Sequence, residues 1–296
     1  MKLGFSVTNL LRHYSSLETI DIVARAGIDC IDFPFYEKNL AEPWPFMEES
    51  AALSRAEELK KYAADKGVSF HQAHEPFAFA LEGDKLKCMR CAAAMGCKYF
   101  VMHPGLAMSY EDFMAAPYKE TEILSEYFNG LAELLRDLGL KGGVENIFCY
   151  DSKRGLVYKG AMATPEIHKA VAQSHPDLCA CLDVGHANIA GVPPEEAVEI
   201  LDSSLEVLHV HDSRDRAFEH TLPIFLSAAA RASHTLPYLG SINWDALAAA
   251  LKKIGFKGVF SFETNNFMAA YPPQLMPAAV KLNAEIGRFL CAKIEG

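Results

Sequence analysis

The 296-residue sequence lacks any apolar run long enough to cross a membrane, although half of its residues are hydrophobic. A membrane-spanning helix needs about 18 or more consecutive apolar residues. The N-terminal segment MKLGFSVTNL reads as a strand and has no cleavable signal pattern. We therefore expect a cytoplasmic protein without a membrane partner, built as one domain over residues 1–296 around a single large core.

Positive charge is scarce, and the cysteines lack the spacing of a metal site. The formal net charge of −10 disfavours a nucleic-acid partner, whose binding depends on neutralising phosphates. Eight cysteines are scattered through apolar runs, where reduced thiols behave as small core residues. Cys88 and Cys91 form a CxxC in a helical run, but no second pair of ligands follows at zinc-site spacing. We expect structural thiols.

No linker rich in proline, glycine or serine divides the chain, and no glycine-rich phosphate fingerprint follows the first strand. Strand-like runs instead alternate with amphipathic helical runs that stop at Gly27, Gly67, Gly96, Gly139 and Gly255. The predicted strands are Leu3–Val7, Ile28–Phe33, Val68–Ala73, Tyr99–His103, Gly142–Asn146, Leu178–Asp183, Val207–His211 and Gly258–Glu263. Eight such units predict an α/β protein, a (β/α)8 TIM barrel.

Acidic or imidazole side chains stand at the ends of four successive strand-like runs. They are Glu145 in GGVEN, Asp183 in CLDVGH, His209 in VLHVHD and Glu263 in VFSFET. One such residue alone commonly caps a loop, but four buried in phase need an offsetting charge. Because parallel strand ends converge on one mouth, the pattern predicts a divalent-metal site and a metal-dependent enzyme. Since His209 and His211 alternate onto one face, the pattern alone allows either as the ligand.

Seven segments carry a family resemblance. They are QAHEPF at Gln72–Phe77, VMHPG at Val101–Gly105, VEN at Val144–Asn146, LDVGHAN at Leu182–Asn188, HVHD at His209–Asp212, HTLPYLGSINW at His234–Trp244 and SFE at Ser261–Glu263. With these segments the chain resembles the xylose isomerase-like TIM barrels, a superfamily of sugar isomerases and epimerases that includes apurinic endonucleases of the same fold. LDVGH together with HxxPxxGxIxW is specific for the superfamily but names no substrate.

The resemblance implies a metal-dependent isomerase or epimerase of sugars or sugar phosphates. One divalent ion would bind Glu145, Asp183, His209 and Glu263, with His209 selected by the family spacing His-x-x-Asp. Mn²⁺, Mg²⁺ or Co²⁺ suits these ligands, and Zn²⁺ is a further option. Proton transfer would run through a metal-bound enediolate. Glu145 and Glu263 would face opposite sides of the carbon, one removing the proton and the other returning it.

The same resemblance implies a small-molecule sugar as partner, and enzymes of this kind are commonly dimers. Substrate contacts are assigned to five histidines that would surround the mouth: His74, His103, His186, His211 and His234. A second ion shared by His74, His103 and the free oxygen of Glu145 remains open.

Three segments depart from the family or allow two interpretations. Epimerases of the family often carry an arginine six residues after the metal-binding histidine, where this chain has Asp215 between Arg214 and Arg216. The stretch Ala217–Ser233 reads either as a helical lid or as a longer connection containing a chance repeat of HTLP. The segment Pro43–Phe46 reads either as an apolar wall for the substrate or as a covering loop.

The main rival function is that of an apurinic endonuclease, whose three-metal site uses additional histidines. His74, His103, His186 and His234 match those positions, but Ala232 replaces an aspartate expected two residues before the last histidine. A third ion would then lack a carboxylate ligand. A dehydratase of a keto-polyol would share the enediolate chemistry, whereas a non-catalytic binding protein would have no use for two opposed glutamates.

Overall fold

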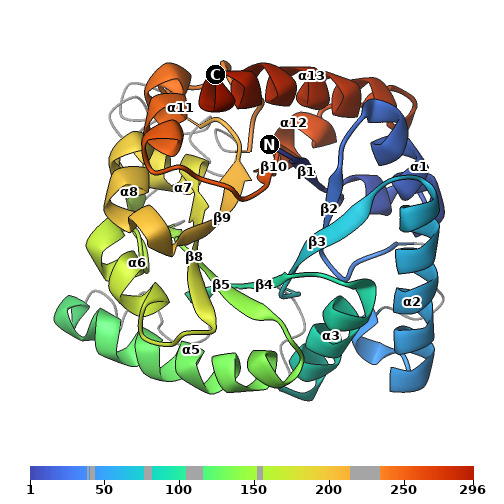
Figure 1. Ribbon diagram of the computed structural model, residues 1–296, viewed down its shortest axis with the longest axis horizontal. Helices are drawn as coiled ribbons and strands as arrows, with labels where there is room; N and C mark the ends of the chain where they lie inside the picture. Colours follow the sequence, from blue (N-terminus) through green and yellow to red (C-terminus); the bar gives the residue numbers. More distant parts are fainter. Residues whose placement is uncertain (39, 41–43, 77–81, 105–115, 152–155, 214–233) are drawn as a thin grey trace.

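A closed barrel of eight parallel strands forms the centre of the protein (Figure 1). The computed structural model describes residues 1–296 except 39, 41–43, 77–81, 105–115, 152–155 and 214–233. The strands follow the order β1-β10-β9-β8-β5-β4-β3-β2. Their bounds are β1 (Leu3–Ser6), β2 (Cys30–Phe33), β3 (Ser69–His74), β4 (Tyr99–Met102), β5 (Lys141–Glu145), β8 (Leu178–Asp183), β9 (Leu205–Val210) and β10 (Phe260–Phe262). Each overlaps one predicted strand, so the (β/α)8 barrel is confirmed.

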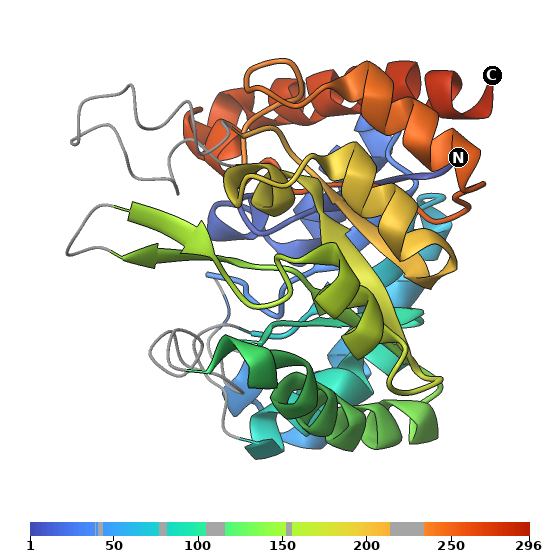
Figure 2. The same cartoon turned by 90° about the vertical axis from the view of Figure 1, so that its left-hand side faces the viewer.

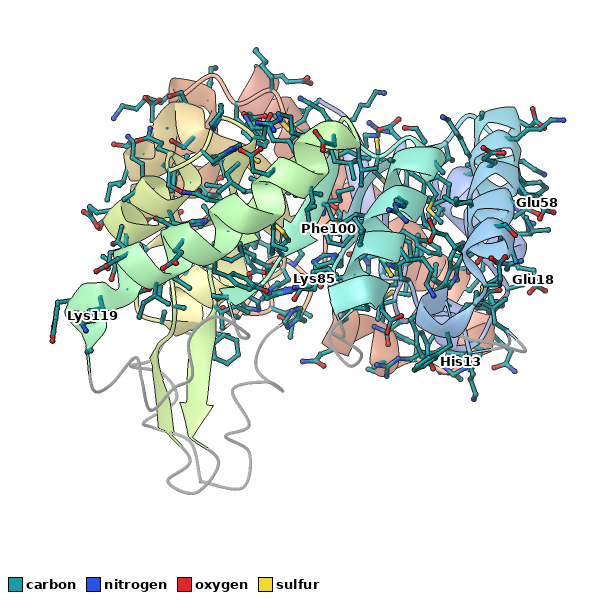
Figure 3. The ribbon with its side chains drawn as sticks, turned by 90° about the horizontal axis from the view of Figure 1, so that it is seen from below. His13, Glu18, Glu58, Lys85, Phe100 and Lys119 are labelled. Carbon is teal, nitrogen blue, oxygen red and sulfur yellow. The ribbon has the colours of Figure 1, made fainter. Side chains whose placement is uncertain are left out.

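Helices cover the outside of the barrel (Figure 1). They include α1 (Ser16–Ala26), α2 (Glu49–Asp65), α3 (Glu82–Met95), α5 (Glu120–Asp137), α6 (Pro165–Ala172), α7 (Val184–Ile189), α8 (Pro194–Leu201), α11 (Trp244–Lys253), α12 (Asn265–Ala269) and α13 (Met276–Glu295). All five glycines predicted to end helices have φ between 67° and 83°, a conformation that costs little without a Cβ. In Figure 3 the exposed side chains of Glu18 and Glu58 project outwards, whereas Phe100 of β4 is fully buried in the core cluster that also contains Phe128 of α5. No described helix combines the length and apolarity that a bilayer crossing requires.

The cysteines in the described part of the chain are free and buried. Burial raises the pKa of Cys88 to about 12 and that of Cys91 to about 11, which keeps both thiols protonated and weakly reactive at neutral pH. Cys179 and Cys181 of β8 pack with Val207 inside the barrel. The CxxC therefore belongs to the core, as expected from the sequence.

Two features near the barrel mouth could not be predicted from the sequence alone. An antiparallel hairpin, β6 (Phe148–Asp151) and β7 (Leu156–Lys159), extends beyond the end of the barrel (Figure 2). Trp44 is 1% exposed and packs edge-on against Phe33 and Phe35, with ring centroids 5.5 and 5.8 Å away. The burial of Trp44 favours the interpretation of this segment as a covering loop over that of an apolar wall for the substrate. Pro43 lies outside the described residues.

His168 ties helix α6 to the barrel. It is 1% exposed, and its Nε2 lies 2.7 Å from the backbone oxygen of Val144 in β5. Burial lowers the pKa of His168 to about 4, with the Val144 bond and Glu145 opposing the shift. At neutral pH the imidazole is therefore uncharged and donates one N–H to the strand that ends in Glu145.

We expect His168 alone to lower the free energy of unfolding by about 3 kcal/mol between pH 7 and pH 4. In this window the unfolded chain protonates His168 near its ordinary pKa of 6.5 while the folded chain does not. The unfolded state thus binds more protons, so stability is lost as pH falls. Urea unfolding of wild type and His168→Gln across this range measures the effect, because the amide keeps a donor but does not titrate. Equal pH slopes in the two proteins would contradict it.

Candidate metal centre

The four predicted metal ligands meet at the mouth of the barrel. One side-chain atom each from Glu145, Asp183, His209 and Glu263 lies within 4.8 Å of the others. Nδ1 of His209 is 3.3 Å from Oε1 of Glu145 and 3.5 Å from Oε2 of Glu263. The structure thus brings together the residues that the sequence selected, while their binding of an ion remains a prediction.

Strand order explains this convergence. β5, β8, β9 and β10 are hydrogen-bonded side by side. Asp183 stands opposite His209 in the register of β8 and β9, and His209 stands opposite Ser261 in that of β9 and β10. Glu145 is the last residue of β5, and Glu263 directly follows β10. The carboxyl ends of four adjacent strands therefore present their side chains to one small volume.

Three carboxylates, two of them buried and that of Glu263 half-buried, make this volume strongly electronegative. The side chains of Glu145 and Asp183 are at most 1% exposed, and that of Glu263 is 13% exposed. Burial raises the pKa of Glu263 above its usual value, whereas for Glu145 the same effect is outweighed by His209 and His103, which hold its pKa well below the usual range. Buried carboxylates need a nearby positive charge. Three carboxylates and one imidazole fit Mn²⁺, Mg²⁺, Co²⁺ or Zn²⁺.

Gln72 of β3 is a partner of the predicted histidine ligand that the sequence did not reveal. Its amide nitrogen lies 2.7 Å from Nε2 of His209. A ligating imidazole usually donates its second N–H to an acceptor. If Nδ1 of His209 faces an ion, Nε2–H would donate to the amide oxygen of Gln72 after a flip of that amide. The sequence offered one signal, because Gln72 and His74 lie two residues apart on the same strand face.

A second group of possible ligands adjoins the first through Glu145. Nε2 of His103 is 3.0 Å and Nε2 of His74 is 3.6 Å from Oε2 of Glu145. These three residues also have the spacing of a metal site. On its far side His74 donates Nδ1–H to Asp32 at 2.9 Å. Burial alone would lower the pKa of His74, but Asp32 and Glu145 raise it well above the usual value. Asp32 was missed because a single aspartate within a strand carries no distinctive pattern.

His211 is held on both sides of its ring. Its Nε2 lies 2.9 Å from Oδ1 of Asp183, and its Nδ1 accepts the backbone N–H of His234 at 2.9 Å. The side chain is 0% exposed. These contacts suit a residue that positions Asp183, whereas its predicted contact with substrate remains without support from the geometry.

The remaining predicted histidines approach the cluster from helix α7, which holds His186, and from the segment around His234. Nδ1 of His186 is 3.4 Å from Oε1 of Glu145, and Nε2 of His234 is 3.8 Å from Oε2 of Glu263. His186, His211 and His234 form a third group together with Asp183. Asp183 is the one carboxylate of this group, and it is also a predicted ligand of the first ion. The prediction that a third ion would have no carboxylate of its own therefore stays a prediction.

Asp212 anchors the segment that carries His234. Its carboxylate accepts the backbone N–H of Tyr238 and the indole N–H of Trp244, each at 2.9 Å. Gly240 permits this approach, since a Cβ there would lie 2.2 Å from Oδ1 of Asp212. The residues Arg214, Asp215, Arg216 and Ala217–Ser233 lie outside the described part of the chain.

A parallel eight-stranded barrel defines the class of TIM barrels, and the carboxylates and imidazoles at the strand ends of this one could hold a metal ion. Residues 20–282 match the sequence profile of the xylose isomerase-like TIM barrels. The chain belongs to this family, and the resemblance seen in its motifs is confirmed.

Individual relatives are distant. The uncharacterised protein MJ1311 of Methanocaldococcus jannaschii is 28% identical over 173 residues, which cover 57% of this chain and 52% of the relative. This chain thus aligns with about half the length of that relative. The crystal structure of a D-tagatose 3-epimerase-like protein is similar with a TM-score of 0.68 and 20% identity, covering 100% of this chain and 98% of the other. The structure of IolI with a bound zinc atom has a TM-score of 0.65, 18% identity and coverage of 99% and 98%.

Proposed function

We propose that this protein is a divalent-metal-dependent isomerase or epimerase of sugars or sugar phosphates. One observation carries the proposal: Glu145 and Glu263 reach the same small volume as Asp183 and His209. Two carboxylates at one point can supply both the base and the acid needed to move a proton off and onto a carbon. The similarity to a D-tagatose 3-epimerase-like protein supports a sugar as substrate.

Glu145, Asp183, His209 and Glu263 would hold the ion, as the zinc-containing relative supports. When bound, a divalent ion would stabilise the negative charge that develops on substrate oxygens as the C–H bond breaks. One carboxylate oxygen of Glu145 or Glu263 takes the proton, and the other glutamate returns it. Because Glu145 and Asp183 are almost fully buried, water has little access to the transferred proton.

The surrounding histidines orient the substrate. We assign His74, His103, His186 and His234 to hydrogen bonds with substrate hydroxyls, since all four lie next to Glu145 or Glu263. The contacts of His211 give it the different task of fixing Asp183. Orientation of this kind raises the rate by holding the reacting carbon close to its base.

A metal-dependent DNA phosphodiesterase of the apurinic endonuclease type is the second candidate. It is favoured by the three adjoining groups of ligands, which centre on Glu145 and Asp183. Three ions would suit phosphodiester cleavage, in which several cations stabilise the attacking and leaving oxygens. The net charge of −10 argues against a duplex DNA substrate.

Metal content and proton exchange together test the proposal. The protein would be loaded with Mn²⁺ and dialysed exhaustively, and its metal measured by plasma mass spectrometry. We expect about one tightly held ion per chain and deuterium incorporation into ketoses in D₂O, lost with EDTA and restored by Mn²⁺. Loss of water from a keto-polyol would instead identify a dehydratase. About three ions per chain together with nicking of abasic DNA would overturn the proposal in favour of the nuclease.

A further inference from the structure

A cavity of about 330 Å³ adjoins the candidate metal centre. It is lined from the connections that follow β1, β2, β3 and β10, and its volume is near the lower end for small-molecule sites. His74 and Glu263 form its buried end, whereas Arg12 and Tyr36 are exposed. The cavity therefore extends from the proposed reaction centre to the positively charged guanidinium of Arg12 at its exposed end.

Arg12 is unusual among the arginines of the described chain. It ends a short 3₁₀ turn, η1 (Leu10–Arg12), whose two leucines are buried and fix the turn while Arg12 is left exposed. Figure 3 shows the neighbouring His13 at the same end of the barrel as the hairpin β6–β7. Arg12 forms no ion pair within the described residues. The other described arginines each pair with a carboxylate: Arg25, Arg55, Arg90, Arg136 and Arg288.

The rest of the cavity wall leaves that positive charge available to a ligand. Glu75 also lines the cavity, but Nζ of Lys85 lies 3.0 Å from its carboxylate and offsets the charge. Lys85, labelled in Figure 3, belongs to α3 and also donates to the hydroxyl of Tyr127 in α5. Pro34, Phe35 and Pro76 contribute apolar surface. A small ligand with one end at the metal cluster would thus meet a guanidinium at its other end.

The local backbone favours a carboxylate over a phosphate. A guanidinium offers a planar fork of N–H donors that matches the two oxygens of a carboxylate. Phosphate sites in TIM barrels commonly add the free N–H groups of a helix N-terminus. Helix α1, which follows Arg12, is already closed by a capping box between Ser15 and Glu18. Glu18 also places negative charge at this helix end, which disfavours a dianion.

We propose, building on the proposed function, that the substrate is a keto-sugar acid. Arg12 binds a carboxylate at the end of the substrate remote from the reacting carbonyl, while the carbonyl end lies against Glu263 and His74. The cavity, the guanidinium of Arg12 without an ion pair among the described residues, and the neutralised Glu75 carry this assignment together.

Three probes and three variants test the assignment. The probes are D-fructose, D-fructuronate with a carboxylate at C6, and D-fructose 6-phosphate, assayed with Mn²⁺-loaded protein by deuterium exchange. We expect the highest kcat/KM for the uronate. In Arg12→Gln the ratio of uronate to ketose kcat/KM should fall by about 10- to 100-fold, mainly through KM, because a charged hydrogen-bonded pair is lost. Arg12→Lys should restore part of the ratio, and Arg25→Gln, which removes a charge outside the cavity, should keep it.

Calorimetric binding of D-fructuronate to wild type and Arg12→Gln separates this inference from the proposed function. Arg12-dependent binding without exchange of any sugar would retain the carboxylate site and refute the isomerase. Exchange without preference for the uronate, or equal losses for ketose and uronate in Arg12→Gln, would overturn the inference and leave the isomerase standing. A preference for the 6-phosphate over the uronate would overturn it in favour of a phosphate site.

Discussion

Proton exchange at the substrate carbon should fall by about 10²- to 10⁴-fold when Glu145 or Glu263 is replaced by glutamine. Glutamine keeps an oxygen that can face a cation, but its amide does not accept a proton at neutral pH. Both glutamates reach the shared volume at the mouth, but each is assigned to one face of the substrate carbon, so neither substitutes fully for the other. Deuterium incorporation at saturating Mn²⁺, with metal content measured in parallel, gives the size of the loss.

Asp183→Asn is the matched control for these variants. Asp183 belongs to the same group of ligands, but it is assigned no proton to move. Asp183→Asn should therefore lower the rate of proton exchange by reducing metal occupancy, and excess Mn²⁺ should largely restore that rate. The two glutamate variants should exchange slowly even when the site is fully occupied. If Glu145→Gln and Glu263→Gln both keep wild-type exchange, the base lies elsewhere, and His186 is the next candidate, because both ring nitrogens of His211 are already engaged.

Gly185→Ala should weaken metal binding by about 10- to 100-fold and destabilise the fold by about 1–3 kcal/mol. A Cβ at position 185 would lie 1.8 Å from Cε1 of His211. His211 is 0% exposed, and its Nε2 lies 2.9 Å from Asp183, so a shift of its ring that relieves this overlap would disturb the contact with Asp183. Calorimetric Mn²⁺ titration and urea unfolding measure the two effects.

A double-mutant cycle assigns this cost to its cause. In a His211→Ala background the added methyl meets no imidazole, so Gly185→Ala should cost little further stability. Gly130→Ala in α5 is the control for replacing a glycine by alanine, because a Cβ there meets nothing within 4 Å. That variant should be neutral or more stable by up to about 1 kcal/mol. Additive losses in the Gly185 and His211 double variant would show that the collision lies elsewhere.

Local sequence pattern was enough to place the barrel and its candidate ligands. Strand-like runs bounded by glycines such as Gly139 predicted the alternation, and because parallel strand ends share one edge, residues like Glu145 and Glu263 were predicted to meet. Gln72 escaped notice because β3 and β9 are not neighbouring strands, so that it meets His209 only once the barrel closes. Asp32 escaped notice because its contact with His74 depends on the register of β2 against β3, which the sequence alone does not give. The hairpin β6–β7 was missed because its four-residue strands carry too little pattern to distinguish them from a loop.

The two halves of the barrel mouth carry different kinds of residue, and this separation bears on how the protein can change. The four predicted ligands of the first ion come from β5, β8, β9 and β10, whereas most of the cavity that holds Arg12 comes from the connections after β1, β2 and β3. Substitutions in those early connections can alter which molecule fits without disturbing the groups that move the proton. A mutant library confined to them should therefore yield altered substrate range more often than loss of activity, which makes this half the natural target for directed evolution.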